Sequence, residues 1–408
     1  MDGTPRRGTS QLLTVPYAEK KQDRDFVASI FDPRKEESRL ERFRSCASFL
    51  VFDHCRHTDH YSKLRQANFC KDRLCITCQW RKSLRLFSSV YKASEWMLDQ
   101  SKFQPKFCLL TLTVQNCEIA DTGSTIKRMT KAFYRLSKRK FWKDRVQGYF
   151  KSLEITFNEK SNTVHPHFHI LLHVDDGYFH PRKYTKQSEW LEEWRSAYKD
   201  FNITQVDIRR IKQEAPGELL KSLCEVVKYS VKPSVFKIKN LSVRERFLKQ
   251  LKTDLRHLHL VQTGGSFWFA FKHLNQSTEE DEMDYTDDPT FGVECPECRQ
   301  DLIRTWFRWV GSEYDFRRQT TLRYLESIKD QDLRDEFDYV YQERQAIMDR
   351  VLLRGTHFNK SFDNSAHQAL VSACPRSHSK GTESGASGEA SPPQRNRRLH
   401  LPQQHSDA

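Results

Sequence analysis

A run of histidines at alternating positions constrains the fold of this chain more than any other feature. It reads His165-Pro-His-Phe-His-Ile-Leu-Leu-His173. Successive side chains of a strand point to opposite faces, so the histidines at 165, 167 and 169 share one face and the apolar residues between them can enter a core. The pattern predicts a strand over residues 164–174 with one polar face and one buried face.

Two imidazoles at positions i and i+2 of a strand can bind one divalent cation, because neutral imidazole is a common metal ligand. His167 and His169 are the candidate ligands. A preceding strand over 149–157, joined by a hairpin at 158–162, brings Glu154 within reach as a third ligand. This donor set leaves positions open for water or a phosphate oxygen, which suits Lewis-acid catalysis on a phosphodiester. The alternative is a solvated strand face without a metal, and the apolar opposite face favours the metal.

A second motif places a glutamate, a tyrosine and a lysine together on a predicted helix over 218–230 and just beyond it. On a helix Glu225, Tyr229 and Lys232 project from one face. A tyrosine can act as a covalent nucleophile, but its pKa of about 10 requires activation by a polarised phosphate or a nearby lysine. Glu225 could activate a water molecule in a later step. Taken alone, the motif is more typical of an ordinary amphipathic helix.

The elements around these motifs follow the order β-α-β-β-α-β and then a helix. Strands are predicted over 107–114, 149–157, 164–174 and 205–211, and helices over 81–99, 124–140, 187–201 and 218–230. That order predicts an α+β fold with a split βαβ, ferredoxin-like antiparallel sheet that has one face covered by helices. Further along, alternating aromatic residues predict strands over 257–273, and residues 316–354 have a helical pattern.

Cysteines are concentrated before these elements: five of the eleven lie within residues 40–80. Cys70, Cys75 and Cys78 provide three thiolates within nine residues, and Cys46 is the preferred fourth ligand of a closed, structural zinc site. The rival fourth ligands are Cys55, His54 and His57. The alternative is that these are small buried residues without a metal. The pair Cys295 and Cys298 forms a second knuckle, but no second pair stands near it in the sequence, so it could be half of an incomplete site.

The charge balance points to a polyanionic partner. Lys and Arg number 68 against 54 Asp and Glu, a net charge of +14, which favours nucleic acid before an anionic membrane surface. No apolar run approaches the length of about 18 residues that a membrane helix needs. The first 30 residues lack the apolar stretch of a signal peptide. The sequence therefore predicts a cytoplasmic protein without a membrane partner, whose cysteines are thiols or metal ligands.

Basic and aromatic residues interleave in two segments, over 138–143 and 209–212. Such segments can contact phosphates and stack on unpaired bases. The candidate DNA contacts are Lys138, Arg139, Lys140, Arg209 and Arg210. The alternative is that 138–143 is a solvated helix end and 209–212 an edge strand, without a role in DNA binding; for either segment alone this is about as good an explanation.

Together these features resemble the HUH superfamily of single-strand endonucleases, and within it the single-tyrosine rolling-circle replication initiators of small bacterial plasmids. Three motifs stand in the family order: the strand 107–116 ending in Thr-x-x-Asn, the histidines of 165–169, and the segment 225–232. The segment Cys70–Arg81 also resembles a cysteine-rich part of this family. The resemblance spans about residues 40–235.

The resemblance implies a metal-dependent DNA nickase. Tyr229 would attack a phosphodiester of the plasmid origin, with Mg2+ or Mn2+ held by His167, His169 and Glu154. Glu225 matches a glutamate that directs water in the terminating cleavage of one branch of the family, and Lys232 would contact the phosphate or activate the tyrosine. The implied partners are double-stranded origin DNA that is single-stranded at the nick, host helicase and polymerase, and a second copy in a homodimer.

The implied organisation has five parts. They are a mobile N-terminus over 1–39, a zinc-binding segment and helix over 40–100, the endonuclease domain over 101–240, a C-terminal extension over 241–374 that is a candidate for origin binding, and a disordered tail over 375–408. Two rival functions remain open: an HUH-type transposase and a non-catalytic zinc-containing nucleic-acid-binding protein. The two-tyrosine transposase pattern is absent because positions 225 and 233 are Glu and Pro. Conjugative relaxases fit less well, since their tyrosine typically precedes the histidines.

Overall fold

The computed structural model describes residues 7–21, 24–57, 60–100, 106–175, 177–181, 184–211, 218–227, 231, 233–274 and 292–327. The tail expected to be disordered, 375–408, lies outside the described residues.

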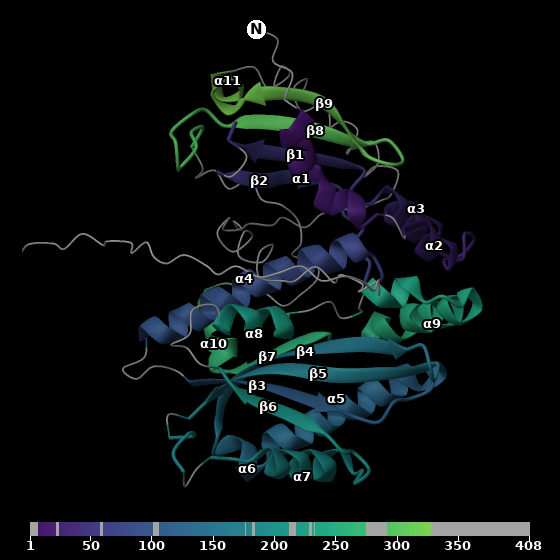
Figure 1. The fold of residues 1–408 in the computed structure, drawn as a ribbon, viewed down its shortest axis with the longest axis vertical. Coiled ribbons are helices and arrows are strands. Elements are labelled where there is room, and N and C mark those ends of the chain that lie inside the picture. The colour runs from purple at the N-terminus through teal and green to yellow at the C-terminus, as the bar shows by residue number, and fades with distance from the viewer. Residues whose placement is uncertain are drawn as a thin grey trace, which may run out of the picture. The chain divides into compact units, whose positions relative to one another are not determined.

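An antiparallel sheet of five strands is built from the middle of the chain (Figure 1). Its order is β6-β3-β5-β4-β7, and every neighbouring pair is antiparallel. The strands are β3 Lys106–Thr113, β4 Val146–Asn158, β5 Thr163–Val174, β6 Val206–Arg210 and β7 Val261–Gly265. The α+β class predicted from the sequence is therefore confirmed, and β7 is an additional strand on the β4 edge.

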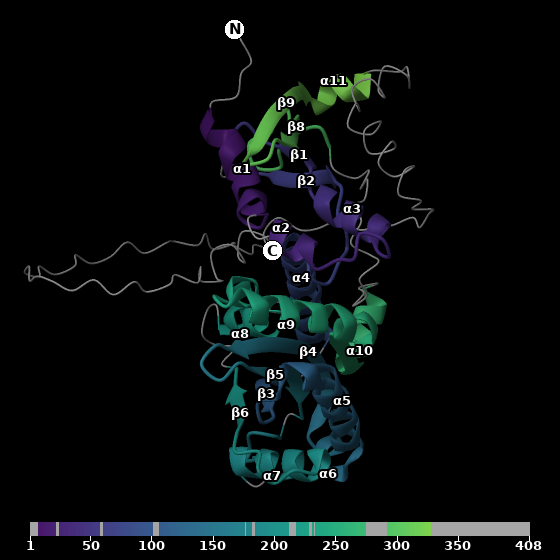
Figure 2. The same ribbon diagram turned by 90° about the vertical axis from the view of Figure 1, so that its right-hand side faces the viewer.

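Helices lie on both faces of this sheet (Figures 1 and 2). One face carries α5 Thr122–Lys138, α6 Lys140–Lys143 and α7 Gln187–Tyr198, and the other carries α4 Ile76–Gln100, α8 Glu218–Val226 and α10 Ser266–His273. The expectation of a single covered face is therefore wrong. It fails because α8 and α10 pack against β4 on the face that carries the histidines.

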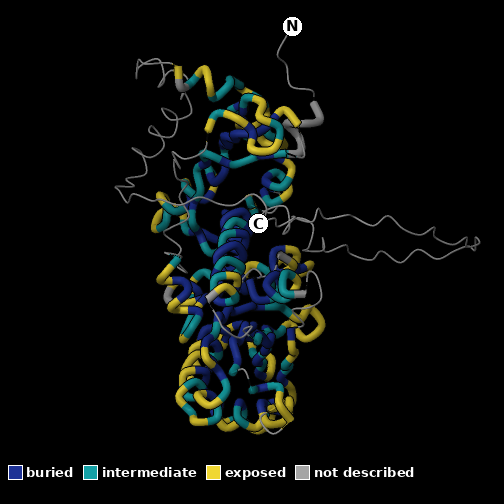
Figure 3. The backbone as a smooth tube through the Cα atoms, turned by 90° about the vertical axis from the view of Figure 1, so that its left-hand side faces the viewer, coloured by how far each residue is buried: buried dark blue, intermediate teal, exposed yellow. Residues whose placement is uncertain are grey.

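The packing of α5 shows why these residues form a helix over a sheet. Ile126, Met129, Phe133 and Leu136 recur every three or four residues and are all buried, so they make one apolar stripe. Phe133 meets Phe168 of β5 edge-on, with 6.1 Å between ring centroids. The apolar face of the histidine strand is thereby covered by α5. In Figure 3 the outward turns of the helices are exposed and the strands between them are largely buried.

Residues 257–273 form a short strand and then a helix, where the sequence predicts strands throughout. β7 ends at Gly265, which has a φ of 59° and whose missing Cβ would meet the carbonyl oxygen of Gln147. The chain leaves the sheet there because only glycine adopts this backbone conformation without strain at so close an approach. The aromatic run beyond it forms α10, with Phe267 and Phe271 buried one turn apart.

A second antiparallel sheet has four strands in the order β2-β1-β8-β9. They are β1 Phe49–His54, β2 Ser62–Ala67, β8 Ile303–Trp309 and β9 Tyr314–Thr321. The helical pattern read over 316–354 is wrong for residues 316–321, which complete β9; α11 Leu322–Ser327 follows, and residues 328–354 lie outside the described part. β9 is a charged edge strand with no continuous apolar face, so its alternation is weak in the sequence.

The N-terminal segment is helical where the sequence predicts a mobile end. The helices are α1 Arg7–Glu19, α2 Arg24–Ser29 and α3 Glu37–Ser45. Tyr17, Val27 and Phe31 are buried in the main core, and the Tyr17 ring packs edge-on against Trp80 of α4 at 5.0 Å. These buried anchors pack α1 and α2 against the core despite the polar composition of the segment.

The remaining described elements are α9 and three short 3-10 helices. They are α9 Leu241–Asp254, η1 Ile119–Asp121, η2 Pro233–Lys237 and η3 Leu255–His257. α9 begins at Asn240, whose side-chain oxygen accepts hydrogen bonds from the backbone N–H groups of Ser242 and Val243. Among the residues that the structure describes, no helix has the length and apolarity to span a membrane.

Candidate active site

The structure brings Glu154, His167 and His169 together on one face of the five-stranded sheet. The pairing of β4 with β5 sets Glu154 directly opposite His167. Glu154 Oε2 lies 2.7 Å from His167 Nε2 and 2.8 Å from His169 Nε2. All three residues are buried, and their ligand atoms lie within 4.8 Å of one another. The hairpin register thus assembles the two imidazoles and the carboxylate that the sequence predicts.

The electrostatics of this cluster favour an ionised carboxylate. Burial alone raises the pKa of the Glu154 carboxyl, but the hydrogen bonds from His167 and His169 outweigh it and hold that pKa well below its usual range. Glu154 therefore presents a negative charge to both rings at neutral pH.

The outer nitrogens of the two rings are also occupied. His167 Nδ1 lies 3.3 Å from the carbonyl oxygen of His165, and His169 Nδ1 lies 3.3 Å from Thr111 Oγ1. A carbonyl can only accept, so His167 Nδ1 donates to it, and a metal ion bound at Nε2 would replace the hydrogen bond from Nε2 to Glu154. A cation shared by the inward nitrogens and the carboxylate suits this arrangement, so the donor set fits a divalent metal.

Glu225 of α8 stands at the edge of this cluster. Its Oε1 atom is 4.0 Å from His169 Nε2, and its side chain is 39% exposed. The residues on either side of the predicted nucleophile are tied to β4: the Val226 carbonyl accepts a hydrogen bond from Ser152, and Val231 forms a parallel bridge with Ile155. Ser152 and Ile155 flank Glu154 in the sequence. Tyr229 and Lys232 themselves lie outside the described residues.

Four cysteines form a separate buried cluster at the junction of α3, β2 and α4. Cys46 Sγ lies 3.6 Å from the sulfurs of Cys75 and Cys78, and Cys70 Sγ lies 3.6 Å from Cys78 Sγ. Thiolates around a tetrahedral metal with bonds of about 2.3 Å are about 3.8 Å apart, so the cluster has metal-site spacing. The structure thus selects Cys46 as the fourth member. Cys55 belongs elsewhere, and His54 Nε2 is 2.9 Å from Thr305 Oγ1.

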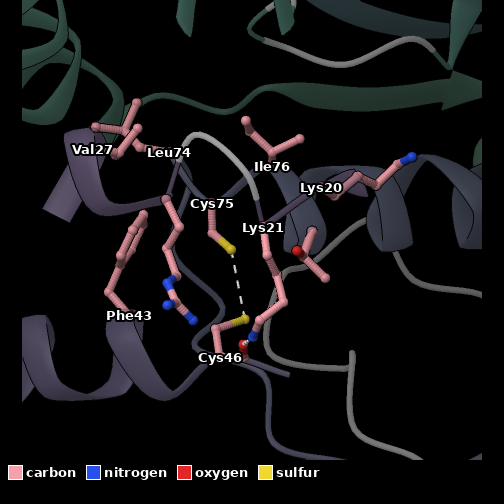
Figure 4. A pocket seen from close by; sticks show the side chains of 10 residues that line it. Lys20, Lys21, Val27, Phe43, Cys46, Leu74, Cys75 and Ile76 are labelled. Atoms are coloured by element: carbon pink, nitrogen blue, oxygen red, sulfur yellow. Dashed lines mark hydrogen bonds between the residues drawn. The ribbon is translucent and has the colours of Figure 1, made fainter. Parts of the chain in front are cut away.

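A lysine backs this cysteine cluster. Lys21 Nζ donates to the carbonyl oxygens of Cys46 at 2.6 Å and Ala47 at 3.0 Å. Burial lowers the pKa of Lys21 to about 8, and the charge of Cys46 works against that shift. Figure 4 shows Lys21 beside the facing sulfurs of Cys46 and Cys75. The lysine thus closes the cluster on its α1 side.

The basic residues predicted to contact DNA come from two separate segments of the chain. Lys138, Arg139 and Lys140 lie at the α5–α6 junction, on the sheet face opposite the histidines. Arg139 is bound to Glu193 of α7 at 2.6 Å. The other two lie on edge strand β6, where the Arg210 guanidinium covers the Phe179 ring at 4.6 Å. Its neighbour Arg209 is 72% exposed.

Sequence reasoning missed the residues that support the histidines. Thr111 contacts His169, whereas the terminal residues of the Thr-x-x-Asn motif have other partners: Thr113 donates to the Gln205 carbonyl, and Asn116 donates to Thr163. The alternation of β3 gives the signal, since Thr111 and Thr113 share a face. Lys151 was also missed; it is 2% exposed and lies in the opposite, apolar layer.

The comparisons identify the family. The model of the replication protein family Rep_1 matches residues 61–316. "Protein rep" of Streptococcus pneumoniae serotype 2 is 34% identical over 257 residues, covering 62% of this chain and 77% of the relative. "Protein rep" of Staphylococcus aureus is 34% identical over 223 residues, covering 54% of this chain and 94% of the relative. No solved structure matches. The chain belongs to the replication protein family, which confirms the resemblance to plasmid rolling-circle initiators.

Proposed function

We propose that this protein initiates rolling-circle replication of a plasmid by nicking one strand of the origin DNA and rejoining it. The observation that carries the proposal is the convergence of Glu154, His167 and His169, with Glu225 4.0 Å from His169. The strand order β6-β3-β5-β4 supports a ferredoxin-like sheet of the HUH endonuclease type, because it is the order of a split βαβ unit with an added antiparallel edge strand.

Tyr229 is the proposed nucleophile. It is two residues from Val231, which is bridged to β4 beside Glu154, so the covalent chain keeps it within about 7 Å of that anchor. Its phenol oxygen attacks the scissile phosphorus, the bond from phosphorus to the 3′ oxygen breaks, and the leaving oxygen takes up a proton. The products are a 5′-phosphotyrosyl link and a free 3′-hydroxyl, from which host polymerase extends after host helicase opens the duplex. Lys232 contacts the phosphate or assists loss of the phenol proton.

Glu154, His167 and His169 would hold Mg2+ or Mn2+, which polarises the scissile phosphate when bound. The protein's part is to keep both imidazoles in one orientation through the His165 carbonyl and Thr111. Glu225 accepts a proton from the water that hydrolyses the phosphotyrosyl link at termination. Its partial exposure at the edge of the cluster supports this role, since water can reach it.

The cysteine cluster is proposed to bind a structural zinc ion. Cys46, Cys70, Cys75 and Cys78 supply four ligands and leave no open position, so the ion would join α3, the end of β2 and the start of α4. A net charge of +14 supports DNA as the partner, and Lys140 and Arg209, whose side chains are 88% and 72% exposed, are accessible to a phosphate. We place the reaction in the cytoplasm, where a homodimer could act on the origin.

Cleavage of a single-stranded origin oligonucleotide tests the proposal. Wild-type protein with Mn2+ or Mg2+ should give a covalent protein–DNA adduct on a denaturing gel, and EDTA should abolish it. Tyr229→Phe should give no adduct, whereas Glu225→Ala should form it and fail to hydrolyse it. Tyr134→Phe is the matched control, because Tyr134 is 63% exposed on α5 across the sheet. No adduct from wild type on either strand of the cognate origin would favour the non-catalytic zinc-containing binding protein.

A further inference from the structure

The four-stranded sheet contains a third cluster of metal-binding side chains, formed by residues from two distant parts of the chain. Strand β1 runs antiparallel to β8, and the register pairs His54 at the end of β1 with Ile303 at the start of β8. The chain that follows β1 therefore lies beside the chain that precedes β8. These two segments carry Cys55 and His60 on one side and Cys295 and Cys298 on the other.

The side chains of these four residues converge. Cys55 Sγ lies 3.4 Å from Cys298 Sγ, which is 243 positions away in the chain, and 3.9 Å from His60 Nδ1. All four ligand atoms lie within 4.8 Å of one another. Cys55 and Cys295 are fully buried, together with Tyr61 and Leu302. Sulfur ligands of a tetrahedral zinc lie about 3.8 Å apart, so the sulfur–sulfur distance of 3.4 Å between Cys55 and Cys298 is close to metal-site spacing.

The backbone around Cys295 and Cys298 is folded as a metal knuckle. The Arg299 N–H donates to the Cys295 carbonyl at 2.9 Å, and the Cys295 N–H donates to the Gln300 carbonyl at 2.8 Å. Arg299 has a φ of 60°, a left-handed conformation that a non-glycine residue adopts only when its surroundings impose it. This tight turn brings both thiols to the same side, facing Cys55.

Neighbouring contacts hold the two halves in place. The Cys55 N–H donates to the Tyr61 carbonyl at 2.8 Å, which closes the loop between β1 and β2 and returns His60 to the cluster. Arg323 of α11 binds Glu294 at 2.7 Å and Asp301 at 2.9 Å, so it clamps the two ends of the knuckle. The ligand geometry thus rests on the sheet and on flanking ion pairs.

We propose that Cys55, His60, Cys295 and Cys298 bind a second structural zinc ion. Three thiolates and an imidazole form a common tetrahedral zinc set, and four protein ligands leave no position for substrate. A disulfide would pair only two of the three thiols and leave the third buried beside a histidine. The ion fastens the hairpin β1–β2 to β8, and so closes a sheet whose halves are far apart in the sequence.

Metal content of the full chain tests this site independently of nicking. We would use His167→Ala/His169→Ala as the background, so that only cysteine clusters retain tightly bound metal, and measure zinc by mass spectrometry after purification without added metal. We expect two zinc ions per chain, one in Cys298→Ser and one in Cys75→Ser. Cys117→Ser is the matched control and should retain two, since Cys117 belongs to none of the three clusters.

His60→Cys keeps the assignment testable if Cys298→Ser does not fold. It should retain two zinc ions, and after cobalt substitution its visible d–d bands should shift, because a ligand set of three sulfurs and one nitrogen becomes four sulfurs. Unchanged zinc content in folded Cys298→Ser would overturn the site. So would an unchanged cobalt spectrum in His60→Cys, or a Cys55–Cys298 disulfide in the unreduced wild-type protein.

Discussion

The two sheets of this protein are assembled from the chain in different ways. The five-stranded sheet takes all its strands from residues 106–265, and each connection carries a hairpin or a helix that packs on the same sheet. The four-stranded sheet joins two hairpins, β1–β2 and β8–β9, with the whole five-stranded sheet inserted between them in sequence. In the first, the strands β4 and β5 that carry Glu154, His167 and His169 form one hairpin; in the second, every contact between β1 and β8 is long-range.

This difference also separates the chemistry of the two sheets. In the five-stranded sheet, one hairpin places Glu154 opposite His167. Glu225 of α8 lies at the edge of this cluster, on the side where we propose that the DNA phosphate binds. In the four-stranded sheet, Asp53 of β1 binds Arg65 of β2 and Arg304 of β8, and the Cys55 cluster lies at the same end. The first arrangement suits catalysis, and the second suits cross-linking of distant segments.

The largest expected effect is on the catalytic side of this comparison. His169→Ala should lower the rate of origin cleavage by more than about 100-fold, because even residues that only orient a metal ligand are worth 10- to 100-fold. Hydrogen exchange of β1 and β8 should be unchanged, since the four-stranded sheet has no part in the site. Gel-based cleavage kinetics and exchange mass spectrometry measure the two quantities on the same sample.

His180→Ala is the control for His169→Ala, because His180 lies in a loop away from the cluster. Cleavage by His169→Ala at the wild-type rate would remove the histidine cluster from the mechanism. Loss of protection in β1 would instead show that the two sheets are coupled.

The fold of the five-stranded sheet could be predicted because its patterns are local. The alternation of 165–173 and the stripe of α5 each identify an element, and the hairpin connector then fixes which residues face Glu154. The Cys70–Cys78 segment was also local, and only its fourth ligand required a choice. The choice of Cys46 rather than Cys55 as the fourth ligand depends on tertiary packing, which the spacing of the cysteines in the sequence does not reveal.

The four-stranded sheet could not be predicted in this way. No local signal pairs β1 with β8, because the register depends on closing a loop of more than 200 residues. The pair Cys295 and Cys298 therefore had no visible partners, although both partners are near in space. The helix α10 was not predicted for a related reason. A short aromatic run fits a strand and a helix equally well in the sequence, and only the turn of the chain at Gly265 decides between them.

The second prediction concerns the core of the five-stranded sheet. Lys151 is 2% exposed, and its Nζ lies 4.2 Å from the centroid of the Phe168 ring. Burial lowers its pKa from 10.5 to about 7. Between these values the unfolded chain binds a proton that the folded protein does not, so wild-type stability should rise with pH. From pH 6.5 to 9 the gain over Lys151→Met should be roughly 3 kcal/mol.

Urea unfolding of wild type and Lys151→Met at both pH values measures this gain. Lys160→Met is the matched control, since Lys160 is exposed at the tip of the same hairpin, and its difference from wild type should not change with pH. A constant difference for Lys151→Met as well would show that Lys151 remains protonated in the folded protein.

The smallest expected effect lies in the four-stranded sheet. Asp53 is 4% exposed and accepts two hydrogen bonds from Arg304, at 2.7 and 3.0 Å, and lies 3.0 Å from Arg65. Asp53→Ala should leave two partly buried guanidinium groups without their shared carboxylate and destabilise the sheet by about 2 kcal/mol, the usual value of hydrogen bonds to a charged group. Hydrogen exchange of β1, β2 and β8 should rise accordingly, while that of β4 and β5 stays constant.

Asp315→Ala provides the comparison within the same sheet. Asp315 pairs with Arg317 at 3.5 Å on the edge strand β9, with its side chain 52% exposed, and should cost less than about 1 kcal/mol. Equal effects of the two substitutions would mean that Asp53 does not link the hairpin to β8. The proposed zinc ion would then be the remaining tie between these distant segments, and Asp53→Ala combined with Cys298→Ser should separate β1 from β8.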